Sequence, residues 1–122
     1  MQEADKSLLV VVRHGPYQGQ LAREALDAVL TAAAFEQPVS LLFMDDGVFQ
    51  LTPNQDGSAI DAKNLATMLA VLPMYDVDRV YVELDSLNLR AISPESLTLP
   101  ATPVGGHALR DLFVNNAHLL SF

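Results

Sequence analysis

Short apolar runs alternate with segments of helical periodicity along this chain, and that alternation limits the folds it can adopt. Residues 8–12 read Leu-Leu-Val-Val-Val, an uninterrupted apolar run typical of a strand that is covered on both faces. Similar runs at residues 39–44 and 79–84 predict a second and a third buried strand. Between the first two runs, residues 20–35 place apolar side chains at the spacing of one helix face.

The rest of the chain continues the alternation. Helical spacing returns at residues 65–72, and an edge strand is expected near residues 97–99, in a stretch rich in proline. Residues 107–115 predict a short helix, and residues 117–122 a last strand. Strands that alternate with helices form a mostly parallel sheet with helices on both faces. We therefore expect a single small α/β domain over residues 1–122, with roughly five strands.

The acidic balance of the chain excludes two classes of partner. The formal net charge is −8, from 15 acidic and 7 basic residues, and the basic residues are scattered. A nucleic-acid-binding surface needs clustered Lys and Arg to replace the counterions of the phosphates. We therefore expect no direct contact with nucleic acid and no adhesion to an anionic membrane.

Hydrophobic residues make up 50% of the chain, at the upper end for so small a domain. A small domain has much surface for its volume, so we expect part of this apolar surface to be buried in an oligomer. No apolar run approaches the roughly 20 residues that span a bilayer. Because residues 1–6 are acidic and polar, unlike a secretory leader, the expected location is the cytoplasm.

One motif suggests an enzyme. Arg13-His14-Gly15 follows the first strand, as in histidine phosphatases, where a histidine at a strand end accepts a phosphoryl group. Against this, the later Gly-Gly pair stands before His107, whereas that family places its glycines after the second histidine, and the chain is short for that fold. A loop or subunit-contact role for His14 is favoured. Phosphoryl transfer remains an alternative, as does a stand-alone module that binds a small anion.

Four segments, in order along the chain, carry a resemblance to a known family. Residues 23–30 read Arg-Glu-Ala-Leu-Asp-Ala-Val-Leu, and the second strand leads into Asp-Gly-Val-Phe-Gln-Leu at residues 46–51. Leu-Pro-Met-Tyr-Asp-Val at residues 72–77 precedes the third strand, and an aliphatic segment closes on Phe122. In this order and spacing, the segments are similar to the TusC/DsrF branch of the DsrE/DsrF/DsrH-like family.

The resemblance implies a DsrE-like fold and a place in a sulfur-relay complex. The implied assembly resembles TusBCD, a heterohexamer with two copies of each of three related chains. Its partners would be TusB-like and TusD-like subunits and, indirectly, a TusE-like acceptor. Such a complex passes persulfide sulfur toward 2-thiouridine in tRNA, and the related Dsr complex handles sulfur in sulfur-oxidising bacteria.

The chain contains no cysteine, whereas the sulfur-carrying members of that family use a cysteine near the end of the third strand. Persulfide chemistry needs a thiolate nucleophile, and Glu83 and Ser86 occupy that stretch here. We therefore expect a non-catalytic, structural or modulatory subunit with no cofactor or metal of its own. Negative charge at Glu83 and Asp85 would raise the pKa of a neighbouring thiol.

The candidate interface or pocket residues cluster around strand ends: His14, Asp46, Gly47, Val48, Phe49, Tyr75, Glu83 and Ser86. Asp45-Asp46-Gly47 is expected to end a strand rather than hold a cation, because no third acidic ligand is near in sequence. Val48 and Phe49 form an apolar pair that needs burial, either in an oligomer contact or in the core.

Aromatic side chains are candidates for both the core and an interface. Tyr75, Phe113 and Phe122 are expected in the core more than at an interface.

Overall fold

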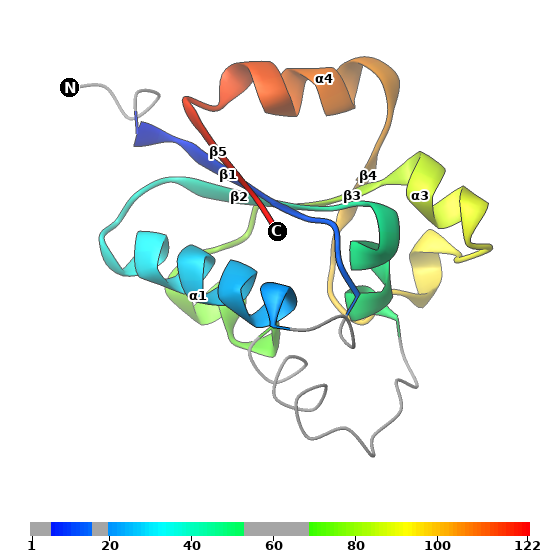
Figure 1. Ribbon diagram of the computed structural model, residues 1–122, viewed down its shortest axis with the longest axis horizontal. Helices are drawn as coiled ribbons and strands as arrows, with labels where there is room; N and C mark the ends of the chain where they lie inside the picture. The colour runs from blue at the N-terminus through cyan, green and yellow to red at the C-terminus, as the bar shows by residue number, and fades with distance from the viewer. Residues whose placement is uncertain (1–5, 16–19, 53–68) are drawn as a thin grey trace.

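The computed structural model describes residues 6–15, 20–52 and 69–122. It contains a five-stranded sheet in the order β4-β3-β2-β1-β5 (Figure 1). Each pair of neighbouring strands is parallel. The strands are β1 (Leu8–Val12), β2 (Val39–Phe43), β3 (Val80–Glu83), β4 (Thr102–Val104) and β5 (His118–Ser121). The predicted α/β class, with a parallel sheet of about five strands, is confirmed.

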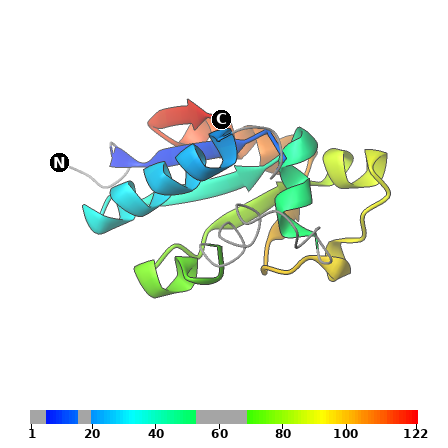
Figure 2. The same ribbon diagram turned by 60° about the horizontal axis from the view of Figure 1, so that its bottom comes forward.

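Helices cover both faces of the sheet, as expected. The α-helices are α1 (Leu21–Ala34), α3 (Leu84–Leu89) and α4 (Gly106–Asn115), and the short 3₁₀ helices are η2 (Asp45–Leu51), η3 (Leu72–Tyr75) and η4 (Pro94–Ser96). In Figure 1, α4 lies above the sheet and α1 below it. Figure 2 shows α1 running along β1 and β2 on the face that is turned toward the viewer. The molecule therefore has three layers.

The continuous apolar run of β1 follows from this layering, because its alternate side chains point into opposite layers. Val10 packs in the same cluster as Leu26 of α1. Leu9 and Val11 pack in a second cluster, with Leu112 of α4 against it. Every residue of β1 and of β2 is buried, so neither strand tolerates the polar alternation of a one-sided sheet.

Small side chains let α1 lie close to the sheet, and its buried residues are Ala22, Ala25, Leu26, Val29 and Ala32. The helix ends where Glu36 takes a left-handed conformation, with φ 59°. The backbone N–H of Gln37 then donates to the carbonyl of Ala32 at 3.0 Å. A left-handed residue combined with this hydrogen bond is the Schellman ending, in which glycine is the usual residue.

The edge strand predicted at residues 97–99 is wrong, because β4 is the edge strand. Leu99 is buried in the core on the α1 side of the sheet. The backbone N–H of Thr98 donates to the carbonyl of Leu51 in η2 at 2.8 Å. The apolar pattern therefore belongs to a loop that packs on η2, and not to a strand in the ladder.

The third strand is shorter than predicted, because the chain turns into α3 at Leu84. The last helix and the last strand lie where they were expected. The first half of the helix predicted at residues 65–72 lies outside the described residues, and Leu69 and Leu72 of the second half are buried. The polar loop at residues 54–58 also lies outside the described part.

Two of the aromatic residues predicted in the core are exposed instead. Tyr75 is 50% exposed and Phe113 is 40% exposed, whereas Phe122 is partly buried against the core on the α1 side. Leu112 faces the sheet, and the next residue of a helix points about 100° away from it. Phe113 therefore lies toward the outer surface of α4.

Candidate functional site

The turn after β2 packs directly against the carboxyl end of β1. An added Cβ on Gly47 would lie 2.0 Å from the carbonyl oxygen of Val12, so only glycine fits there. The same carbonyl accepts the backbone N–H of Met44 at 3.0 Å. Asp45 begins η2 in a left-handed conformation, with φ 51°, which aspartate tolerates better than most residues. The Asp-Asp-Gly sequence thus folds η2 back over β1.

Ser86 ties the end of β3 to this turn. Its hydroxyl donates to Oε1 of Glu83 and accepts the backbone N–H of Asp45 at 2.8 Å. The residue is only 3% exposed. Since the hydroxyl is buried and hydrogen-bonded on both sides, it is unavailable as a nucleophile, and its function here is to hold three segments together.

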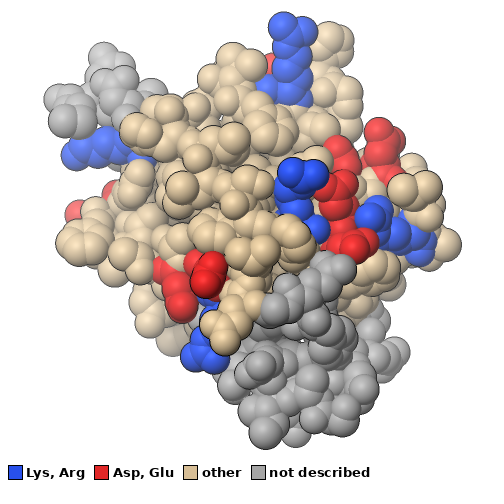
Figure 3. Space-filling view, viewed as in Figure 1, with Lys and Arg blue, Asp and Glu red and all other residues tan. Residues whose placement is uncertain are grey.

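Two arginines, from different elements, pair with the two aspartates of the turn. Arg13 Nε lies 2.8 Å from Asp45 Oδ2, and Arg90 Nη2 lies 2.9 Å from Asp46 Oδ1. The side chain of Arg13 is 55% exposed, and an ion pair this exposed contributes at most about 1 kcal/mol to stability. Figure 3 shows acidic and basic side chains gathered over η2 and α3, at the right of the molecule.

Arg90 also joins an aromatic residue to this group. Its guanidinium carbon lies 5.9 Å from the ring centroid of Phe49, a cation–π distance, and Nη1 donates to the carbonyl of Ser86 at 3.3 Å. Phe49 is 39% exposed, whereas Val48 is fully buried. The predicted apolar pair is therefore divided: Val48 belongs to the core, and Phe49 lies on the surface.

His14 lies at the same edge of the sheet and is half-buried. Its backbone carbonyl accepts a hydrogen bond from Gln50 Nε2 at 2.9 Å, and its buried Nδ1 has no hydrogen-bond partner in the described part of the chain. His107 follows β4, and β3 and β2 lie between β4 and β1. Three strand spacings separate such positions by about 14 Å. The two histidines therefore do not share one phosphoryl site.

The arginines at this edge do not support an anion site either. Arg13 and Arg90 are both engaged by aspartates, so a phosphate or another small anion would have to displace a carboxylate from each. Neither alternative function, phosphoryl transfer or anion binding, gains support from this arrangement.

Tyr75 is the one predicted site residue that lies elsewhere. It ends η3, before β3 begins, and lines a pocket of about 360 Å³ with Glu36, Asp78 and Arg79. These residues stand at the amino ends of the strands. All the other predicted residues lie at the carboxyl edge, in the group just described, which we call the carboxyl-edge cluster: His14, Asp46, Gly47, Val48, Phe49, Glu83 and Ser86, with Arg13, Asp45, Gln50 and Arg90.

Four members of this cluster were not among the residues predicted for the site: Arg13, Asp45, Gln50 and Arg90. Arg13 and Asp45 had a usable signal, because each directly follows a buried strand. Arg90 had no such signal, because its position is determined by α3, which it directly follows. That helix was not predicted, and its first residue, Leu84, was assigned to the third strand.

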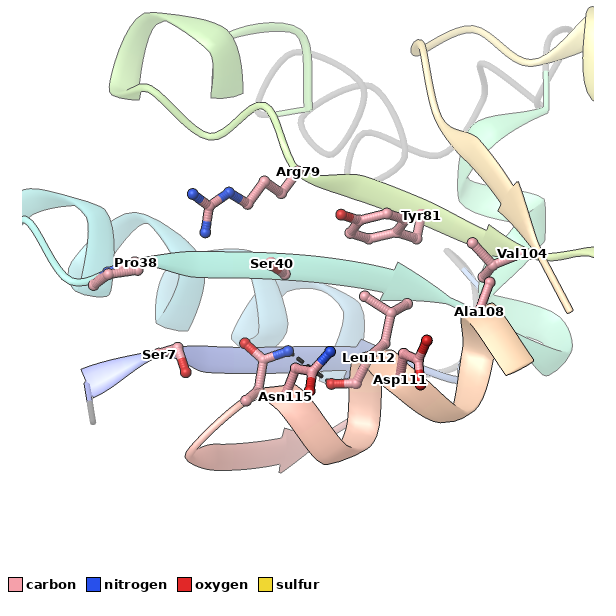
Figure 4. A pocket seen from close by; sticks show the side chains of 11 residues that line it. Ser7, Pro38, Ser40, Arg79, Tyr81, Val104, Ala108, Asp111, Leu112 and Asn115 are labelled. Carbon is pink, nitrogen blue, oxygen red and sulfur yellow. Dashed lines mark hydrogen bonds between the residues drawn. The ribbon is translucent and has the colours of Figure 1, made fainter. Parts of the chain in front are cut away.

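A larger pocket, of about 560 Å³, lies between α4 and the sheet. In Figure 4, Arg79 lies just before β3 and Tyr81 projects from that strand, and Asp111, Leu112 and Asn115 stand opposite on α4. None of the predicted site residues lines it. Among the described helices, α4 packs on this face, and it leaves the surface of β2 and β3 around Ser40 and Tyr81 partly open.

Within residues 6–15, 20–52 and 69–122, no three His, Cys, Asp or Glu side chains come together as a metal site would require. Over the same residues, no helix has the length and apolar character needed to cross a membrane.

Comparison with known proteins identifies similar sequences over most of the chain. The DsrE/DsrF-like family model matches residues 6–122. The chain is 45% identical over 107 residues to a protein TusC homolog of Pseudomonas aeruginosa, covering 88% of this chain and 90% of that protein. It is 43% identical over 97 residues to the intracellular sulfur oxidation protein DsrF of Allochromatium vinosum, covering 80% of this chain and 71% of that one.

A solved structure has the same fold. The crystal structure of the YchN protein from E. coli superposes with a TM-score of 0.71, covering 96% of this chain and 99% of that one. Its sequence identity is 18%, so the likeness concerns the fold alone.

Proposed function

Because this chain belongs to the DsrE/DsrF-like family, we propose that it is a non-catalytic subunit of a TusBCD-like sulfur-relay complex. TusB-like and TusD-like chains would be its partners, with two copies of each subunit. A TusD-like subunit would carry the persulfide, and a TusE-like protein would receive it. This chain would stabilise the assembly and shape the surface around the partner's thiol.

One observation carries the proposal, and it concerns the end of β3. Sulfur-carrying members of the family resembled here have a cysteine in this stretch, whereas this chain has hydrogen-bonded side chains without a thiol. The chain contains no cysteine at all, and the hydroxyl of Ser86 is buried between Glu83 and Asp45. Neither a carboxylate nor a buried hydroxyl replaces a thiolate in persulfide transfer. Sulfur would therefore pass through another subunit.

The exposed apolar side chains support assembly. Met74 and Phe35 are 81% and 82% exposed, and an isolated domain gains nothing from leaving large apolar groups in water. Burial at subunit contacts would remove them from water.

The test is co-expression with TusB-like and TusD-like chains, followed by size-exclusion chromatography with light scattering. We expect all three chains in one particle with the mass of six subunits. A chain that elutes alone while the other two subunits associate with each other would overturn the proposal.

The destination of the sulfur needs a separate measurement, because one relative bears the name of an intracellular sulfur oxidation protein. We propose 2-thiolation of the wobble uridine of tRNA as the destination, with sulfur oxidation as the second candidate. In cells that lack this chain, 2-thiouridine measured in hydrolysed tRNA should fall toward the level found without the TusD-like subunit. Unchanged 2-thiouridine together with impaired sulfide or thiosulfate oxidation would favour the second candidate.

A further inference from the structure

The two edges of the sheet differ in how far they allow another strand to pair. At one edge, β4 has Pro103 at its centre, paired in register with Val82. Proline has no N–H to donate, and its presence is a common protection of an edge strand. At the other edge, β5 contains neither proline nor Lys, Arg, Asp or Glu. Among the described strands, β5 therefore offers the open edge.

The hydrogen bonds to β1 determine which backbone groups of β5 face outward. The N–H of His118 donates to Ser7 at 3.0 Å, and the N–H of Phe122 donates to Val11 at 2.9 Å. Backbone groups of a strand alternate in direction along the chain. Leu119 and Ser121 therefore direct their N–H and C=O groups away from β1, toward whatever lies beside the edge.

The side chains of β5 also form an uncharged surface. All four of its residues are exposed, and Leu119 and Leu120 are 53% and 43% exposed. Phe113 and Val114, in the last turn of α4, add further exposed apolar surface, with Val114 at 69%. Figure 3 looks toward this edge, and its charged side chains stand mostly around the rim of a broad uncharged area.

From this edge we infer that β5 pairs antiparallel with β5 of a second copy of this chain, about a two-fold axis at Leu120. Leu119 would then lie opposite Ser121 of the other copy, so that their outward backbone groups exchange hydrogen bonds. A shift that centres the axis on Leu119 would need the N–H of Ala117, which already donates to Ser7 Oγ at 3.0 Å. The register centred on Leu120 uses only outward groups.

Two features favour β5 of a second copy as the strand that pairs with this edge. Pairing of β5 with the β4 edge of another copy would be head-to-tail and would extend indefinitely, and Pro103 in β4 disfavours it. The chain also carries a net charge of −8, so two copies repel each other unless they meet at an uncharged surface. The β5 edge is such a surface, and a two-fold contact there closes after two chains.

The absence of native cysteine permits a test without background. In the inferred register, Leu120 faces Leu120 as a pair without mutual hydrogen bonds, where the Cα atoms of antiparallel strands lie about 4.5 Å apart. That separation lies within the range of a disulfide. The variant Leu120→Cys should therefore form a covalent dimer under mild oxidation. Leu89→Cys, on α3 and 82% exposed, is the matched control and should remain largely monomeric.

A second variant tests the backbone pairing itself. Ser121→Pro removes an outward N–H without touching the ladder to β1, and Ser121→Ala keeps that N–H. Light scattering over a concentration series should show the dimer mass, twice 13.2 kDa, for the unaltered chain and for Ser121→Ala, and a several-fold weaker dimer for Ser121→Pro. Cross-linking of Leu120→Cys no faster than Leu89→Cys would overturn the inference.

The same cross-link should be measured in the complex co-expressed with the TusB-like and TusD-like chains. A disulfide between two copies of this chain supports the inference there, and a disulfide from Leu120→Cys to a sister subunit overturns it. This result is independent of the proposed function, which fails only if the three chains do not associate.

Discussion

At the scale of single residues, Gly47 is the position where backbone geometry leaves least freedom. Replacement by alanine would place a Cβ 2.0 Å from the carbonyl oxygen of Val12 and 2.7 Å from its carbon. Both are backbone atoms of a buried central strand, so they cannot turn aside as a side chain would. We expect Gly47→Ala to lower the free energy of unfolding by roughly 2–4 kcal/mol, measured by chemical denaturation.

The matched control for that variant is Gly105→Ala, because the nearest atom to its added Cβ is Leu84 Cβ at 3.9 Å. This is an ordinary van der Waals contact, and the free energy of unfolding should change by no more than about 0.5 kcal/mol. Equal losses in the two variants would contradict the close approach of η2 to β1.

At the scale of elements, the end of α1 carries a local strain that can be removed. Glu36 is left-handed, with φ 59°, a conformation that costs an L-residue roughly 1–2 kcal/mol. Glycine adopts it without that cost but loses more backbone entropy on folding. We expect Glu36→Gly to raise the free energy of unfolding by about 0.5–1 kcal/mol, measured from the shift in the denaturation midpoint.

Ala34→Gly, two residues earlier at the last residue of α1, is the control, and it should lower the free energy of unfolding by up to about 1 kcal/mol. A loss of stability in both variants would show that the left-handed turn is not strained.

The elements that could be predicted from the sequence are those with a long regular pattern. β1, β2, α1 and α4 follow from apolar runs and helical spacing, because burial on one or two faces decides their residues. α3 could not be predicted in this way: its six residues complete fewer than two helical turns, and its first residue, Leu84, continues the apolar pattern of β3. The apolar pattern of residues 97–99 resembled that of a strand because Leu99 is buried in the core, although it belongs to a loop outside the sheet.

The candidate site was predictable to the extent that it follows strand ends. In a parallel sheet, residues after successive strands meet at one edge, so His14, Asp46 and Glu83 could be assigned together. Their partners could not. Arg90 lies 44 residues from Asp46 in sequence, and only the packing of α3 against η2 decides that the two pair.

At the scale of the whole molecule, the carboxyl-edge cluster should act on a thiol that belongs to a partner. We propose that Glu83, half-buried at the end of β3 and hydrogen-bonded by Ser86, lies near the partner's thiol in the assembled complex. A nearby negative charge disfavours the thiolate and so raises the pKa of that thiol. Glu83→Gln removes the charge, while its amide oxygen can still accept the hydrogen bond of Ser86.

We therefore expect Glu83→Gln to lower the pKa of the partner's thiol by about 0.5–1, measured from the pH dependence of its alkylation rate in the purified complex. Glu36→Gln, an exposed position at the amino ends of the strands, makes the same change in net charge on the opposite side of the sheet from the cluster. Because exposed charges beyond about 10 Å are largely screened at 0.1 M salt, this control should leave the thiol pKa unchanged. If both variants moved it equally, the effect would belong to the net charge of the assembly, and Glu83 would have no local influence on the thiol.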